Sequence, residues 1–252
     1  MLRYQKTGSG FPVVLLHGFC ENNTCFNQQV LLLKEHFTLI APVLPGTTMA
    51  DFPTAKSIEN MADDVQELLA SLAIKQCVMC GHSMGGYVTL AFAKKYPTLL
   101  TGIGLLHSTA LADDDARKEK REQTKRVIET KGAPFFAKGF IPGLFAENTP
   151  TNLITDFVSV AELLTDDGLI AQVNAMKNRP DYTAFIAHCT LPVFWAIGKH
   201  DPLLPEDSLF KQALLAKTAY IAYWTNSSHM GHVEQPQELA KHMIRFCTSI
   251  AD

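Results

Sequence analysis

The segment Gly81-His82-Ser83-Met84-Gly85 points most directly to chemistry. An apolar run at 76–80 precedes it, and a helical pattern at 85–96 follows. A G-x-S-x-G segment between a strand and a helix places its serine on a sharp, strained turn, so that the hydroxyl projects from the end of a sheet. The flanking glycines allow strand and helix to approach closely, and the helix amino terminus favours negative charge there. Although G-x-S-x-G also occurs by chance in turns, this context predicts that Ser83 is a nucleophile.

A serine hydroxyl becomes a strong nucleophile only when an adjacent base takes its proton. Nine histidines could be that base, and His229 stands out because it follows the last predicted strand, 219–224. Its nearest rival is His232, which we expect to be a pocket or structural residue. Asp201 follows the predicted strand 192–197, and the order Ser, Asp, His suits a triad on one sheet edge. An aspartate before a proline is also common in turns, but order, spacing and strand-end position together predict the triad Ser83, Asp201 and His229.

The rest of the chain supplies the elements that would position this triad. Short apolar runs alternate with helical periodicity, which predicts an α/β protein with a mostly parallel twisted sheet flanked by helices. The predicted strands are 12–16, 37–44, 76–81, 99–106, 192–197 and 219–224, with 2–7 as a short edge strand. The predicted helices are 57–72, 84–96, 205–216 and 235–250.

Residues 111–185 break this alternation. They contain no convincing strand, and 75 residues are too many for an ordinary loop. We therefore predict a helical cap at 111–185, inserted into a core domain formed by 1–110 and 186–252. The aromatic group of this cap could line an apolar pocket or pack between the cap helices; it consists of Phe135, Phe136, Phe140 and Phe145.

Composition excludes several functions. The formal net charge is −3, and residues 113–131 hold seven basic side chains against six acidic ones. That balance favours a solvated helix over a phosphate-binding strip, so nucleic acid is not an expected partner. No apolar run approaches the roughly 18 residues of a membrane span, so no membrane partner is expected.

The cysteines indicate a reducing compartment. Six cysteines fall at irregular positions, and the amino terminus lacks the apolar core of a signal peptide, which together favour reduced thiols in the cytoplasm. Cys77 and Cys80 form a CxxC inside an apolar run without a second pair. Buried core thiols are therefore expected instead of a zinc or redox site. Neither a metal nor a cofactor is predicted.

Four segments resemble the α/β-hydrolase superfamily: His17-Gly18, residues 81–85, the loop 198–201, and the H-x4-E-Q-P run at 229–236. The chain is most similar to cofactor-free serine esterases, 3-oxoadipate enol-lactonases and related carbon–carbon hydrolases. The resemblance implies the α/β-hydrolase fold with a cap at 111–185, and an oxyanion hole formed by the amides of Phe19 and Met84. The run at 43–50 departs from the family pattern Asp-x-Pro-Gly-x-Gly-x-Ser, so the loop beside the pocket is expected to have its own shape.

These residues predict a serine hydrolase that cleaves a carboxylic ester or thioester of a small, partly apolar substrate through an acyl-enzyme, as carboxylesterases (EC 3.1.1) do. One alternative is a carbon–carbon hydrolase or lyase that uses the same triad. Another is a non-catalytic protein of the same fold that only binds a ligand. An aspartate nucleophile is disfavoured because position 83 is serine. The expected assembly is a monomer or homodimer.

Overall fold

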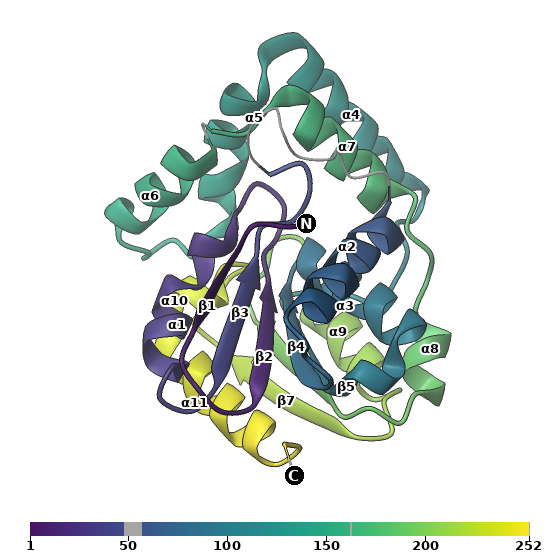
Figure 1. Cartoon of the computed structure of the whole chain (residues 1–252). Coiled ribbons are helices and arrows are strands. Elements are labelled where there is room, and N and C mark those ends of the chain that lie inside the picture. Colours follow the sequence, from purple (N-terminus) through teal and green to yellow (C-terminus); the bar gives the residue numbers. More distant parts are fainter. Residues whose placement is uncertain (48–56, 162, 252) are drawn as a thin grey trace.

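Seven strands form one mostly parallel sheet in the computed structural model, which describes residues 1–47, 57–161 and 163–251 (Figure 1). Their order is β1-β3-β2-β4-β5-β6-β7, and only β1 runs antiparallel to its neighbour. The strands are β1 (Tyr4–Thr7), β2 (Pro12–Leu16), β3 (Thr38–Pro42), β4 (Cys77–His82), β5 (Leu100–Leu106), β6 (Val193–Gly198) and β7 (Ala219–Trp224). The predicted fold class is confirmed, and so is the short edge strand at the amino terminus.

Helices cover both faces of the sheet. In β2, Val13 and Leu15 face one buried apolar cluster while Val14 and Leu16 face another, as the alternation of a strand requires. Helices α2 and α3 pack together over the second cluster, and α1 and α11 pack together over the first (Figure 1). This double coverage explains why the central strands are apolar on both faces. The helices outside the segment between β5 and β6 are α1 (Asn27–Leu33), α2 (Ile58–Ser71), α3 (Met84–Lys95), α9 (Glu206–Ala213), α10 (Gly231–Glu234) and α11 (Pro236–Thr248), with 3-10 turns η1 (Asn23–Phe26) and η2 (Pro97–Leu99).

The four helices predicted within the sheet region are confirmed; α3 begins where predicted, and the other ends are one to three residues shorter. Ser57 caps α2 as its residue type suggests, because its Oγ accepts the amide of Asn60 at 3.1 Å. Helix α1 was not predicted, since a seven-residue segment offers too few turns for a clear apolar period.

Between β5 and β6 the described residues form helices and turns but no strand. They are α4 (Asp115–Lys131), α5 (Ala133–Phe140), η3 (Ile141–Leu144), α6 (Thr151–Ala161), α7 (Asp166–Lys177) and α8 (Thr183–His188). Helices α4 to α7 gather at one end of the molecule (Figure 1). The predicted boundary at 185 falls inside α8, and the division into core and cap remains a proposal. We call the segment from α4 to α8 the insertion. None of the described helices is both long and apolar enough to cross a bilayer.

Hydrogen bonds tie the insertion to the loops that follow the strands. The side chain of Gln172 in α7 donates to the carbonyl of Pro45 at 2.9 Å, in the loop after β3. The amide of Tyr182 donates to the carbonyl of Ala110 at 2.8 Å, in the segment after β5. The insertion is thereby anchored at the carboxyl edge of the sheet.

The two cysteines of the CxxC are fully buried on β4, with free thiols. Burial raises the pKa of Cys77 to about 12, and that of Cys80 well above its ordinary value. The prediction of buried core thiols is confirmed for both residues.

Candidate active site

Ser83 lies on a strained turn between β4 and α3. Its φ of 49° and ψ of −115° fall in a region that side-chain-bearing residues rarely adopt. The turn is tight enough to exclude side chains at both flanking glycines. A Cβ on Gly81 would lie 2.1 Å from the carbonyl oxygen of Gly85, and one on Gly85 would lie 2.2 Å from that of Leu16. The glycines predicted to permit this turn are therefore required by backbone contacts.

The structure brings together all three residues of the predicted triad. His229 Nε2 lies 2.9 Å from Ser83 Oγ, and His229 Nδ1 lies 2.8 Å from Asp201 Oδ2. The other oxygen of Asp201 accepts the amides of Leu203 and Leu204, at 2.9 and 3.0 Å. Burial alone would raise the pKa of Asp201, but the neighbouring histidines and their hydrogen bonds lower it. An ionised Asp201 requires His229 Nδ1 to carry a proton, which leaves Nε2 free to accept the serine proton.

Glu234 holds the loop that carries His229. One carboxylate oxygen accepts the amide of Ser228 at 2.7 Å and the hydroxyl of Ser227 at 3.0 Å. The other accepts the amide of Ala146, from the insertion, at 2.6 Å. The glutamate of the H-x4-E-Q-P run therefore joins the histidine loop to the insertion, a role that the sequence alone did not indicate.

The two amides predicted to form an oxyanion hole flank the serine. The amide of Met84 opens α3 directly after the turn, and that of Phe19 follows the end of β2. A Cβ on Gly18 would lie 3.2 Å from Ser83 Cβ, so the turn before Phe19 lies against Ser83. Within residues 1–47, 57–161 and 163–251, neither amide donates a hydrogen bond. Both amides are therefore without a partner in the described residues, and their role as oxyanion donors remains a proposal.

A buried ion pair next to the triad was missed by the sequence analysis. His82 Nδ1 lies 3.0 and 3.1 Å from the two carboxylate oxygens of Glu21, and both side chains are nearly inaccessible to solvent. His82 Nε2 lies 2.9 Å from the carbonyl oxygen of His229. With Glu21 ionised, both ring nitrogens of His82 face acceptors, which favours the doubly protonated ring with its positive charge. Glu21 also accepts the amide of Gly18 at 2.7 Å, so this pair connects the turn before Phe19 to the backbone of His229.

The pKa shifts agree with this geometry. Burial favours the neutral form of each group, yet the Glu21 carboxylate and the hydrogen bonds of the ring raise the pKa of His82. The charge of His82 and the hydrogen bonds to Glu21 likewise lower the pKa of that carboxyl, against the effect of burial. Both shifts favour a charged pair beside Ser83.

His232 completes a cluster whose ligand atoms could hold a metal ion, together with Glu21 and His82. These atoms lie within 4.8 Å of one another. Both nitrogens of His82 are already engaged, and its direct contact with Glu21 satisfies the carboxylate without an ion. His232 is fully buried and does not line the pocket, and burial lowers its pKa well below the ordinary value. We therefore interpret it as a neutral packing residue against His82, whose ring centroid lies 4.1 Å away.

His17 is also structural. Its Nε2 accepts the amide of Leu44 at 2.9 Å, and burial lowers its pKa to about 4, so the ring is neutral. It thereby joins the loop after β2 to the loop after β3. Residues 43–47 of the run that departs from the family pattern lie in this second loop, whereas 48–50 lie outside the described residues.

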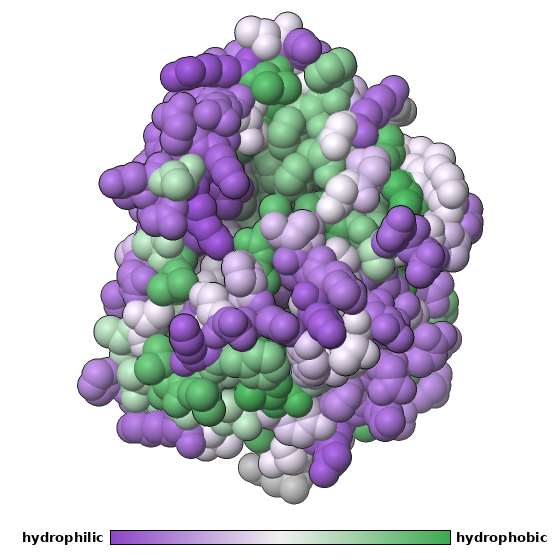
Figure 2. All heavy atoms as spheres, turned by 180° about the vertical axis from the view of Figure 1, so that it is seen from behind, coloured by the Kyte–Doolittle hydropathy of each residue, from purple (hydrophilic) through white to green (hydrophobic). Residues whose placement is uncertain are grey.

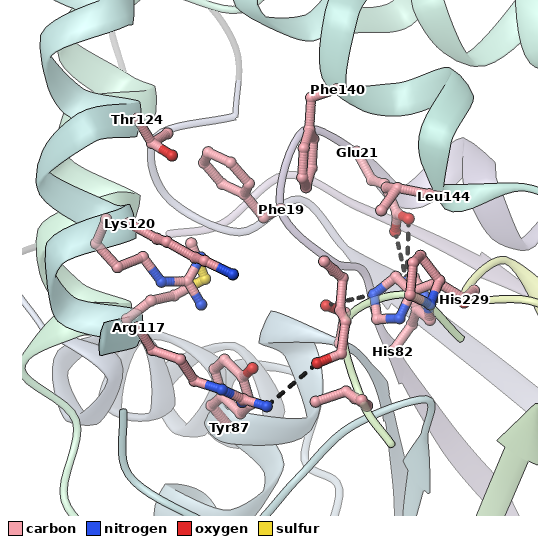
Figure 3. Close-up of a pocket in the computed structure, with 16 residues that line it drawn as sticks. Phe19, Glu21, His82, Tyr87, Arg117, Lys120, Thr124, Phe140, Leu144 and His229 are labelled. Atoms are coloured by element: carbon pink, nitrogen blue, oxygen red, sulfur yellow. Dashed lines mark hydrogen bonds and ion pairs between the residues drawn. The ribbon is translucent and has the colours of Figure 1, made fainter. Parts of the chain in front are cut away.

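A pocket of about 240 Å³ opens over Ser83 and His229. One part of its wall is apolar, another is polar and comes from α4, and the remainder surrounds the triad (Figure 3). Of the four phenylalanines considered in the insertion, Phe140 lines the pocket, while Phe136 packs against it with ring centroids 5.1 Å apart. Phe135 is exposed, and Phe145 is buried elsewhere. The apolar wall consists of Phe19, Phe140, Leu144, Met176, Pro202, Leu203 and Leu204.

The polar wall was missed because the charges of residues 113–131 nearly cancel. Arg117, Lys120, Arg121 and Thr124 line the pocket from α4. Their spacing of three, four and seven residues places them on one helical face. The helical spacing of the basic residues indicates a basic face on this helix, whereas the net charge of residues 113–131 does not.

Comparison with known proteins shows what the chain as a whole is similar to. The sequence profile of the alpha/beta hydrolase family matches residues 13–242. A thermophilic esterase from Thermogutta terrifontis, solved with malate bound, is 28% identical with a TM-score of 0.94, over 100% of this chain and 94% of that one. The enol-lactonase from Burkholderia xenovorans LB400 shares the fold, with 20% identity and a TM-score of 0.89, over 98% of this chain and 96% of that one.

A match to an uncharacterized protein of Mycobacterium tuberculosis is more limited. It is 34% identical over 112 residues, which make up 44% of this chain and 33% of that protein. The chain therefore matches only about a third of the length of that relative.

Proposed function

Since the chain belongs to the alpha/beta hydrolase family, we propose that it is a serine hydrolase that cleaves a carboxylic ester or thioester of a small, partly apolar substrate. Ser83 is the nucleophile, His229 the general base and acid, and Asp201 the group that orients His229. The observation that carries the proposal is the continuous hydrogen-bonded chain Ser83–His229–Asp201, with distances of 2.9 and 2.8 Å, at the base of a pocket.

Catalysis begins when Ser83 Oγ attacks the carbonyl carbon and its proton passes to His229 Nε2. Asp201 stabilises the imidazolium that forms. The amides of Phe19 and Met84 donate to the negative oxygen of the tetrahedral intermediate, and each such donor is typically worth about 10²–10³ in rate. His229 then protonates the leaving alcohol or thiol, which produces an acyl-Ser83 ester and restores the neutral imidazole.

Water completes the cycle. His229 removes a proton from a water molecule as it attacks the acyl carbonyl, and then returns that proton to Ser83 as the acid leaves. Esters and thioesters are favoured over amides because alkoxides and thiolates leave more readily than amines. The apolar wall of the pocket gives the acyl or alcohol group a place to bind.

A fluorophosphonate probe tests the nucleophile, and 4-nitrophenyl esters of increasing chain length test turnover. Ser83→Ala should abolish labelling and lower kcat by about 10⁴–10⁶. Ser159→Ala, on α6 and outside the pocket, is the matched control and should leave both unchanged. Labelling that persists in Ser83→Ala would refute the nucleophile, and loss of turnover in His232→Ala but not in His229→Ala would refute the base.

Other reactions give different results in the same assays. A carbon–carbon hydrolase would cleave vinylogous diketones and leave esters largely intact. A protein that only binds ligands would neither react with the probe nor turn over any ester.

A further inference from the structure

The polar wall of the pocket is a basic stripe on α4. Arg117, Lys120 and Arg121 line the same cavity as Ser83 and His229. Figure 3 shows Arg117 and Lys120 extending from α4 on one side of the pocket, with His229 and Leu144 on the other. A helix normally buries apolar residues over a cavity, yet α4 turns basic side chains toward this one.

Among the described residues, an acidic side chain pairs with only one of the three basic residues of this stripe. Glu21 is the one carboxylate among the lining residues, and His82 and the amide of Gly18 already engage it. Arg121 is paired with Asp113 at 3.1 Å. Arg117 donates to the carbonyl oxygen of Leu203 at 3.2 Å, which holds the guanidinium in place and leaves its charge intact.

Lys120 and Arg117 have no carboxylate partner in the described parts of the chain. Arg117 is half-buried, so its charge is less screened than that of a fully exposed side chain. Positive charge therefore borders the pocket without compensation from the protein.

The opposite part of the pocket is apolar. Seen from behind, a recess in the upper half of the molecule is lined by hydrophobic residues and flanked by a hydrophilic wall on the side where α4 lies (Figure 2). In Figure 3, Phe19 and Phe140 line the pocket above the gap between the side chains of α4 and His229. A substrate that fits this arrangement has an apolar middle and an anionic end.

We propose that the substrate is a carboxylate-bearing ester, whose free carboxylate is bound by Lys120 and Arg117 while its ester carbonyl lies at Ser83. This inference rests on the proposed function. An arginine fork matches a carboxylate, and a lysine adds a mobile point charge. The basic stripe thus selects the substrate by charge, and the apolar wall accommodates the chain between its two ends.

Three esters of equal length test this selection in the wild-type protein: mono-4-nitrophenyl adipate, 4-nitrophenyl 6-methylheptanoate and 4-nitrophenyl 5-(trimethylammonio)pentanoate. They end in a carboxylate, a neutral group of the same shape, and a cation. We expect kcat/KM to be about tenfold higher for the adipate than for the neutral ester, and lowest for the cationic ester. This preference should weaken as salt is added. An adipate that is no better than the neutral ester would overturn the inference.

Variants on α4 locate the effect. Lys120→Met should lower the ratio of kcat/KM for the adipate to that for the neutral ester by about fivefold to tenfold, and Lys120→Glu should reverse the order of the anionic and cationic esters. Lys118→Met is the matched control, because Lys118 is exposed on the same helix and does not line the pocket. An equal change of the ratio in Lys118→Met would assign the preference to the overall charge of the protein and overturn the inference.

A binding measurement separates this inference from the proposed function. If no ester is hydrolysed, the proposed function fails, and calorimetry with adipate still tests the anion site. Binding that weakens in Lys120→Met but not in Lys118→Met supports the site. Absent binding, or equal affinity in all three proteins, overturns it.

Discussion

Replacement of Glu21 by glutamine tests whether a buried ion pair supports the active site. In the wild-type protein the raised pKa of His82 contributes stability that is present below the unfolded value of 6.5 and is lost as pH rises through the folded pKa. The lowered pKa of Glu21 contributes stability that is present above the unfolded value of 4.5 and is lost as pH falls. The ion pair therefore contributes its full stabilisation between pH 4.5 and pH 6.5.

Glu21→Gln removes the charge but preserves the shape. The new amide can accept the hydrogen bond from Gly18 and donate to a neutral His82, so the loss at pH 8 should be only about 1–2 kcal/mol. Without the carboxylate, burial lowers the pKa of His82, and the ring folds in its neutral form. Below pH 6.5 the unfolded variant then binds one more proton than the folded variant, and the difference grows by about 1.4 kcal/mol per pH unit. We expect a loss of about 3–4 kcal/mol at pH 5.

Urea unfolding of both proteins at pH 8, 7, 6 and 5 measures this difference. Glu35→Gln is the matched control, because Glu35 is exposed and forms no ion pair within the described residues, and it should give a curve parallel to the wild type. If Glu21→Gln also gives a parallel curve over this range, His82 is not a cation in the folded wild type, and the reasoning from its two acceptors is wrong.

Three other predictions concern the turn, the acid and the histidine loop. Gly85→Ala places a Cβ 2.2 Å from a backbone oxygen and should lower the free energy of unfolding by more than about 3 kcal/mol in thermal unfolding. Its control is Gly139→Ala, in open space on α5, which should be neutral or stabilise by up to about 1 kcal/mol. Asp201→Asn should lower kcat by about 10⁴ in an ester assay with little change in KM, because His229 loses the acceptor that fixes its tautomer. A loss of kcat below tenfold would contradict this role. Glu234→Ala should lower kcat and increase hydrogen exchange at the amides of Ser228 and Ala146, because both lose their acceptor.

The parts of the site predicted from sequence share a physical feature. Ser83 and its two glycines are constrained by contacts within a few residues, so a short motif contains the whole geometry. Asp201 and His229 each follow a strand of one parallel sheet, and parallel strands end at a common edge. The sequence could therefore place three distant residues together because the topology had already been inferred from apolar periodicity.

Other residues escaped prediction because their roles depend on contacts across long stretches of chain. Glu21 meets His82 from 61 residues away, and nothing in the segment around either residue marks the pair. Glu234 reaches Ala146 across 88 residues. The basic stripe of α4 differs, since its spacing is visible in the sequence, but its orientation toward the pocket depends on how α4 packs against α5 and α7.

The histidine loop links two sides of the site. The backbone of His229 donates to the carbonyl of Leu144 at 3.1 Å, in the insertion, and accepts from His82 at 2.9 Å, beside the nucleophile. Glu234 adds a second connection from this loop to the insertion. A movement of the insertion that opened the pocket would therefore have to break or carry these contacts, and would disturb the imidazole of His229, the proposed base. If the proposed roles hold, substrate entry and the alignment of His229 are connected, because the same few hydrogen bonds hold both the wall of the pocket and the histidine at its base.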